Sequence, residues 1–222
     1  MLIGESYIGE GAEAAHVNVV LGERSGPVGA AWATALATPS AGHTPFVAVL
    51  IPGLPVKPMT LFVNKAAIAN DEHGNLTWGA AQAGVAGGVA DAVSEGIVSE
   101  ADADQNLIIA AVWVNPAATD AEKVYANNRT ATREALRAGA AGTPQMAEVL
   151  VARHRPFNPF YSAPSGGQEP VGESGPEAAG DGGREAAGDG SGEPGGGGTG
   201  GGGQEPGGGA DEGGHAQAAE PQ

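Results

Sequence analysis

The feature that most constrains this chain is the abrupt loss of large apolar side chains after Tyr161. No Phe, Trp, Tyr, Ile, Leu or Met occurs in residues 163–222, which hold 23 of the 39 glycines and 11 of the 26 acidic residues but one base, Arg184. A segment with so little to bury cannot offset the entropy of ordering. We therefore expect residues 163–222 to be a disordered Gly/Glu/Pro-rich acidic tail, either a solubilising extension or a tether to a basic partner.

The remaining residues, 1–162, are enough for one folded domain of ordinary size. Because the chain has no cysteine, a disulfide framework, a zinc ribbon and a thiol nucleophile are excluded. No apolar run approaches the ~20 residues that span a bilayer, and the first residues lack a signal-peptide pattern. A net charge of −16 offers no basic stripe for nucleic acid. We expect a cytoplasmic protein with neither a membrane nor a nucleic acid as its partner.

Apolar periodicity along residues 1–162 predicts alternating strands and helices. The expected strands are 16–21, 46–51, 60–68 and 107–114, and the expected helices run from 27 to about 38, from about 79 to 96 and from 119 to about 139. A further apolar segment, 146–151, follows them. Interleaved elements of this kind are typical of a mixed α+β fold in two layers.

Three polar side chains on these elements are candidates for chemistry. His16 lies on the opposite strand face from Val17 and Val19, and an imidazole can give or take a proton near neutral pH. Its alternative is an ordinary hydrogen-bonded or surface histidine. Lys65 is either an anion contact or a strand lysine that reaches to solvent. Gln82 either contacts a ligand edge or supports an exposed helix start.

The familiar catalytic and metal-binding motifs are missing from the sequence. It contains no phosphate-binding loop, no nucleophile elbow and no paired-histidine spacing. The five histidines are scattered, with no carboxylate at a ligand-like spacing. Nothing in these patterns argues for a metal site, although they do not exclude one.

Several motifs, taken together, resemble the formaldehyde-activating enzyme family from about Ile3 to Phe160. They occur in the family's order and spacing: GEG at 9–11, AH at 15–16, PGLPVKP at 52–58, TL at 60–61, NK at 64–65 and GAAQAGV at 79–85. The resemblance implies an α+β two-layer sandwich like domain 2 of ribosomal protein S5. It also implies a ring-shaped homopentamer with pterin sites between subunits, no metal and no tightly bound cofactor.

The activity that the resemblance implies is a hydro-lyase reaction of one-carbon metabolism and formaldehyde detoxification. Formaldehyde and tetrahydromethanopterin condense to 5,10-methylene-tetrahydromethanopterin and water. A proton donor lets water leave the N-hydroxymethyl intermediate, and a second pterin nitrogen, already close, captures the iminium. The family's proton donor falls on His16, and its pterin-contacting lysine and glutamine fall on Lys65 and Gln82.

Four positions depart from the family pattern around the implied pterin site. Asn18 replaces an aspartate, Val47 a leucine, Ala67 a threonine and Ala83 a histidine. Each replacement changes a contact to the substrate rather than the proton donor. The alternatives are therefore a diverged paralogue that uses another pterin- or folate-like carrier, a non-catalytic formaldehyde- or pterin-binding protein, and a structural ring whose tails recruit other proteins.

Overall fold

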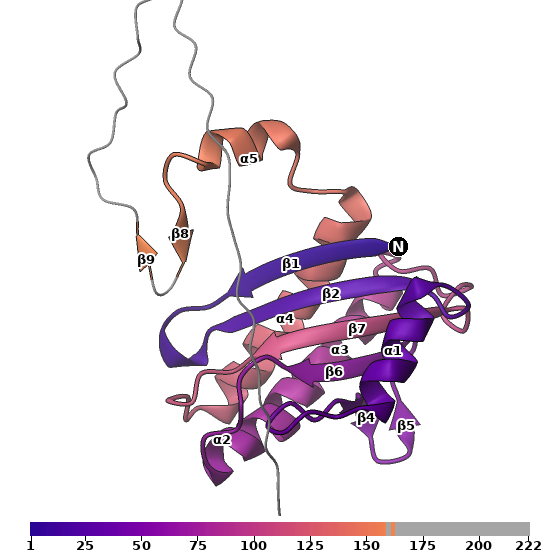
Figure 1. Cartoon of the computed structure of the whole chain (residues 1–222), viewed down its shortest axis with the longest axis horizontal. Helices are drawn as coiled ribbons and strands as arrows, with labels where there is room; N and C mark the ends of the chain where they lie inside the picture. The colour runs from indigo at the N-terminus through magenta and orange to yellow at the C-terminus, as the bar shows by residue number, and fades with distance from the viewer. Residues whose placement is uncertain (159–160, 163–222) are drawn as a thin grey trace, which may run out of the picture. The chain divides into compact units, whose positions relative to one another are not determined.

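A five-stranded mixed sheet forms the centre of the domain (Figure 1). The computed structural model describes residues 1–158 and 161–162; the predicted tail lies outside the described residues. The strand order is β1 (Leu2–Ile8), β2 (Ala15–Glu23), β7 (Asn106–Trp113), β6 (Met59–Asn64) and β3 (Phe46–Val47). All neighbours are antiparallel except β6 and β7, which run parallel.

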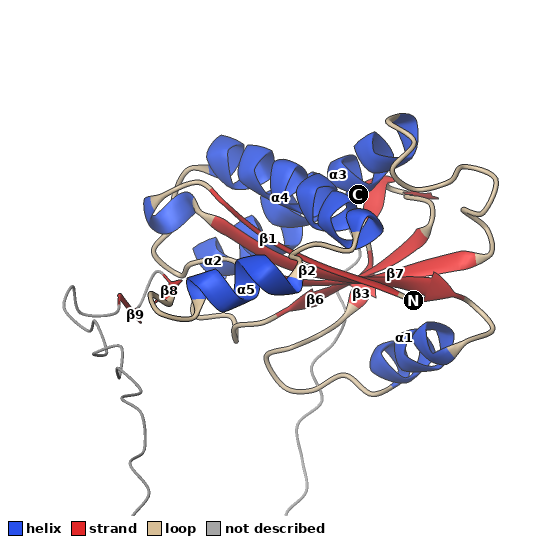
Figure 2. Cartoon of the chain, turned by 90° about the horizontal axis from the view of Figure 1, so that it is seen from above, coloured by secondary structure: helices blue, strands red, loops and turns tan. Residues whose placement is uncertain are grey.

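Helices lie on both faces of this sheet (Figure 2). α3 (Gln82–Ser94) and α4 (Ala121–Ala141) cover one face, and α1 (Pro27–Ala37) lies on the other. The core is on the α3 and α4 side, where alternate strand side chains are buried: Val17, Val19, Phe62, Ile108, Ala110 and Val112. The predicted α+β class is therefore confirmed, whereas the predicted two layers are incomplete, because α1 adds a helix on the second face of the sheet.

Short elements connect these layers. They are a 3-10 turn (Gly11–Glu13), β4 (Val49–Ile51), β5 (Leu54–Pro55), α2 (Asp71–Asn75), a π-helical turn (Leu76–Ala81), α5 (Met146–Ala152), β8 (Phe157–Asn158) and β9 (Tyr161–Ser162). The β4–β5 and β8–β9 pairs are separate two-stranded hairpins.

Two predicted strands are wrong in extent. The run 46–51 divides at Ala48, because β3 pairs with β6 whereas β4 pairs with β5. Ile51 is 61% exposed, so this apolar run is not a buried strand. The run 60–68 ends as a strand at Asn64, whose side-chain amide donates to the carbonyl oxygens of Gly42 and Ala66 and so supports a turn.

Helix boundaries also differ from the sequence pattern at three places. The predicted loop at 70–75 contains α2, whose N-terminus is capped by the Asn70 side chain accepting from the His73 amide. α4 begins at Ala121 with Asp120 as its cap, rather than with a capping box at Thr119. The apolar segment 146–151 is helical, but its side chains are exposed.

Glycines bring α3 and α4 into close backbone contact. A Cβ atom built at Gly88 would lie 2.4 Å from the carbonyl oxygen of Arg129, and one built at Gly84 would lie 2.5 Å from that of Tyr125. No larger residue fits at either position without moving a helix. The sequence GAAQAGVAGGV therefore determines how closely the two helices pack.

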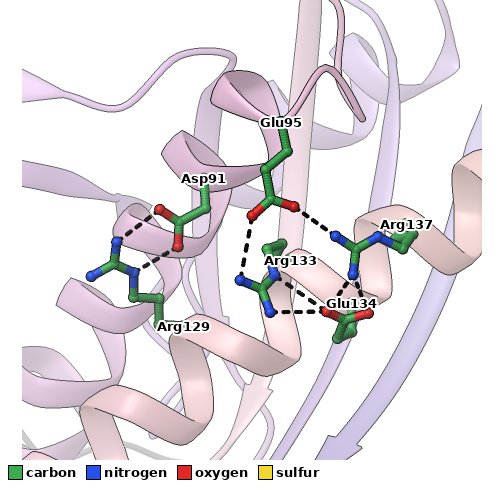
Figure 3. A network of polar contacts seen from close by, with 6 residues as sticks. All are labelled: Asp91, Glu95, Arg129, Arg133, Glu134 and Arg137. Carbon is green, nitrogen blue, oxygen red and sulfur yellow. Dashed lines mark hydrogen bonds and ion pairs between the residues drawn. The ribbon is translucent and has the colours of Figure 1, made fainter.

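Ion pairs reinforce the same helix contact (Figure 3). The Asp91 carboxylate accepts from Nε and Nη2 of Arg129 at 2.6 and 2.7 Å, and this pairing holds the pKa of Asp91 below its usual value. Glu95, the residue directly after α3, bridges Arg133 and Arg137 of α4. Among the described residues, no helix is long and apolar enough to cross a membrane.

Candidate active site

One half of the α1-side sheet face is left uncovered by the described helices. Val28 of α1 packs on Gly22, near the far end of β2. At the opposite end, Tyr7, His16 and Trp113 are neighbours in register across β1, β2 and β7. Strand side chains alternate between faces, so these three residues share the open face.

A second row of side chains lies beside the first on this face. Glu5, Asn18, Ala111 and Val63 are in register across four strands. This places Glu5 and Asn18 next to His16, although Glu5 is eleven residues away in sequence. The prediction that His16 lies opposite the buried valines is confirmed, since Val17 and Val19 are in the core.

Lys65 reaches this group from the other side of β7. It directly follows β6, and its backbone amide donates to the Val112 carbonyl oxygen at 2.7 Å. Its Nζ atom donates to Oδ1 of Asn18 and lies 3.4 Å from the His16 carbonyl oxygen. Two strand spacings of ~4.8 Å separate β6 from β2, so the lysine must cross β7. Ala111, with only a methyl group, is the β7 residue in register with Asn18.

His16 is held by the strand on its other side. Its Nε2 atom lies 2.9 Å from Oε1 of Glu5, with the two side chains 39% and 57% exposed. The Tyr7 ring lies 6.2 Å from the imidazole, centroid to centroid, at a tilt of 57°. The imidazole is therefore fixed by a carboxylate and an aromatic ring while remaining open to solvent.

Burial and charge lower two pKa values in this cluster. Burial lowers the pKa of Lys65 to about 8, and the Glu5 carboxylate opposes this shift. Burial, followed by the Lys65 ammonium, lowers the pKa of His16, while Glu5 raises it through its charge and its hydrogen bond. Lys65 can therefore change protonation at mildly alkaline pH, while the charged form of His16 is disfavoured by burial and Lys65 and favoured by Glu5.

A hollow of about 550 Å³ is lined by the register neighbours of His16, although not by His16 itself. Tyr7 and Trp113, its neighbours on β1 and β7, line this hollow together with Phe157, Asn115 and the turn at 9–11. Flat aromatic surfaces and polar backbone beside an ionisable group are typical of a small-molecule site. Among the described residues, no group of His, Asp and Glu is arranged to hold a metal ion.

Comparison with known proteins decides which family this site belongs to. A family model described as formaldehyde-activating enzyme (Fae) matches residues 3–161. The chain belongs to the formaldehyde-activating enzyme family. The match covers nearly all of the described residues and ends before the predicted tail.

Members of the formaldehyde-activating enzyme family resemble this chain over about 160 residues. A 5,6,7,8-tetrahydromethanopterin hydro-lyase of Methanosarcina barkeri is 42% identical over 159 residues, covering 72% of this chain and 89% of the relative. The Bifunctional enzyme Fae/Hps of Archaeoglobus fulgidus is 43% identical over 158 residues, covering 71% and 40%. The chain thus spans about two fifths of the length of the bifunctional relatives.

The remaining family positions are not gathered around His16. Gln82 is almost fully buried on α3, on the other face of the sheet, and its Nε2 donates to the Val49 carbonyl oxygen at 2.8 Å. Because a π-helical turn precedes it, Gln82 does not support an exposed helix start. Val47 lies on edge strand β3, paired with Leu61. Ala67 lies two residues after Lys65 and close to Gly42, where a built Cβ would lie 3.0 Å from the methyl group of Ala67.

Glu5, Tyr7 and Trp113 are site residues that the sequence analysis missed. β1 was not predicted, although Leu2, Gly4, Ser6 and Ile8 alternate with the outward residues. The GEG turn could have indicated that this strand folds back on 15–23. That pairing would have placed Glu5 and Tyr7 beside His16.

Proposed function

We propose that this chain is a lyase that condenses formaldehyde with tetrahydromethanopterin to 5,10-methylene-tetrahydromethanopterin and water. The observation that carries the proposal is the open-face cluster of His16, Glu5 and Lys65, in a chain 42% identical to a tetrahydromethanopterin hydro-lyase. Both reactants are substrates, and the proposal needs neither a metal nor a tightly bound cofactor. The reaction belongs to one-carbon metabolism and formaldehyde detoxification in the cytoplasm.

His16 is the proposed catalytic residue. Attack of a pterin N–H on formaldehyde gives an N-hydroxymethyl group, and loss of hydroxide from it is difficult. A proton from His16 lets water leave instead, which is typically worth ~10²–10⁴-fold in rate. The second pterin nitrogen captures the resulting iminium because it is already close. Its proton restores the imidazolium, so that atoms and charge balance over the cycle.

Asn18, Val47, Lys65, Ala67 and Gln82 are the proposed substrate-binding positions. Lys65 and Asn18 lie beside His16, whereas Gln82 is on the other face of the sheet. A site that uses both faces is complete only if a second chain supplies one of them. This arrangement supports sites between neighbouring subunits, and we propose the homopentamer, and the domain like domain 2 of ribosomal protein S5, that the family resemblance implies.

Exposed apolar side chains also support self-association. Six of the 14 exposed large hydrophobic residues that the structure describes lie on α5 and the segment that follows it: Met146, Val149, Leu150, Val151, Phe157 and Tyr161. Contiguous exposed apolar surface commonly marks an interface. The proposed ring would cover these side chains.

A second candidate is the same chemistry on another pterin- or folate-like carrier, or carrier binding without catalysis. The observation that favours it is the Lys65–Asn18 contact, in which a neutral amide replaces the family's carboxylate. The crowded position of Ala67 beside Gly42 points the same way. Assays with a folate carrier alongside tetrahydromethanopterin distinguish the two candidates.

The proposal predicts that His16→Ala abolishes catalysis without unfolding the protein. Methylene formation by the full chain is compared with the spontaneous rate, and we expect the variant to lose about 10²–10⁴-fold of the enzymatic rate. His215→Ala, outside the family match, is the matched control and should retain full activity. Equal turnover by wild type and His16→Ala would overturn the proposal, as would a folded wild type that does not exceed the spontaneous rate with either carrier.

A further inference from the structure

The Glu5–His16 pair occupies only one of the two imidazole nitrogens. Nε2 faces the Glu5 carboxylate at 2.9 Å, whereas Nδ1 has no hydrogen-bond partner among the described residues. An imidazolium donates from both nitrogens. When Nε2–H is engaged by Glu5, Nδ1–H is the donor left to meet a substrate.

Strand pairing fixes this geometry. Glu5 is in register with Asn18 and Tyr7 is in register with His16, so the carboxylate approaches the imidazole diagonally from a paired strand. The Tyr7 ring limits the positions open to the imidazole. A group placed by two paired strands is positioned more reproducibly than one on a loop.

The charged groups around His16 have opposite effects on the protonation of its imidazole. Glu5 and Tyr7 face it from β1, Lys65 reaches it from the end of β6, and uncharged Trp113 faces it from β7. The ammonium of Lys65 disfavours a second positive charge on the imidazole, whereas the carboxylate of Glu5 favours it. Glu5 is the only acid among these groups.

We propose that Glu5 is a positioning residue for the proton donor: it binds Nε2 of His16, directs Nδ1 towards the N-hydroxymethyl group and stabilises the imidazolium next to Lys65. This inference rests on the proposed function. The inference assigns the transferred proton to Nδ1 of His16. From Nδ1 the proton passes to the hydroxyl of the N-hydroxymethyl group, which leaves as water. Glu5 neither gives nor takes the transferred proton and does not contact the substrate.

The test combines an NMR titration of His16 with the pH dependence of turnover in Glu5→Gln, using the full chain. The amide keeps the shape of the side chain but removes its charge. We expect the pKa of His16 to fall by about half a unit to one unit, and kcat at pH 7.5 to fall about three- to tenfold, because the protonated fraction falls tenfold per unit. KM for the pterin should change little. Glu5→Asp, which retains the charge, should restore part of the lost kcat.

Glu23→Gln is the matched control for loss of one carboxylate. Glu23 lies on β2, seven residues from His16 and thus ~23 Å along the strand, and this variant should leave both measurements unchanged. An active wild type whose His16 titration and pH profile are unaltered by Glu5→Gln overturns the inference alone. A wild type with no hydro-lyase activity overturns the proposed function and, with it, the catalytic purpose of Glu5, even where the titration still shows the pairing.

Discussion

At the scale of single residues, the unusual feature of the site is a lysine bound to a neutral amide. Lys65 donates to Asn18, and burial lowers its pKa to about 8. Half-burial of an ammonium without a carboxylate in direct contact disfavours its charged form. The Asn18 substitution therefore affects the electrostatics of the cluster as well as one hydrogen bond.

Replacing Asn18 by Asp should restore that charge. The new carboxylate favours the ammonium, so the pKa of Lys65 should rise from about 8, and pterin binding that depends on its charge should persist to higher pH. We expect pterin affinity or turnover to improve about fivefold, or ~1 kcal/mol, because a charge-assisted bond replaces a neutral one. Titrating KM and kcat from pH 6.5 to 9.5 measures both effects. Unchanged values would mean that this position does not limit carrier use.

The sequence indicated some site residues and could not indicate others. Two-residue alternation alone places His16 and Asn18 on one strand face, away from Val17 and Val19. Contact between Lys65 and Asn18 depends on strand order, which periodicity does not contain. Glu5 became a neighbour of His16 only through the pairing of β1 with β2.

At the scale of elements, the same limitation explains the errors in secondary structure. The consecutive apolar residues of 46–51 predict a single buried strand. In the structure, however, β4 leaves the central sheet and pairs with β5. Segment 146–151 is apolar and helical without being buried. The sequence shows which segments carry apolar side chains. Which other strand or helix packs on a segment, and so buries those side chains, is decided by the tertiary structure. The helix at 82–94 was predictable because Val85 and Val89 lie on one buried face.

The packing of α3 on α4 leads to a prediction about neighbouring glycines. Gly84→Ala should destabilise the fold by about 1–3 kcal/mol, because the added methyl would lie 2.5 Å from the Tyr125 carbonyl oxygen. Gly87→Ala, on the same helix, meets only the Arg129 side chain at 3.4 Å. It should be neutral or stabilise by ~0.5–1 kcal/mol through helix propensity. Denaturant unfolding compares the two; equal stabilities would contradict the close helix contact.

At the scale of the whole molecule, the exposed apolar residues of α5 lead to a prediction about assembly. Val151 is 78% exposed, so a glutamate there costs little within one chain but would be buried and unpaired in an interface. Val151→Glu should therefore lower the mass measured by light scattering and reduce turnover. Ala101→Glu, at an exposed loop position, is the control and should keep the wild-type mass. An unchanged mass for Val151→Glu would exclude α5 from the interface.

The position of β7 in the middle of the sheet has a consequence for how activity arises during synthesis. The first 65 residues already contain His16, Asn18 and Lys65, yet β2 and β6 are not neighbours in the sheet, and only β7, which pairs with both, brings Lys65 to the other two residues. That strand is complete only at Trp113. The cluster proposed to act on formaldehyde therefore cannot assemble before residue 113 has been made. We expect a chain that lacks β7 to show no enzymatic turnover, because the cluster proposed to act on formaldehyde is not assembled in it.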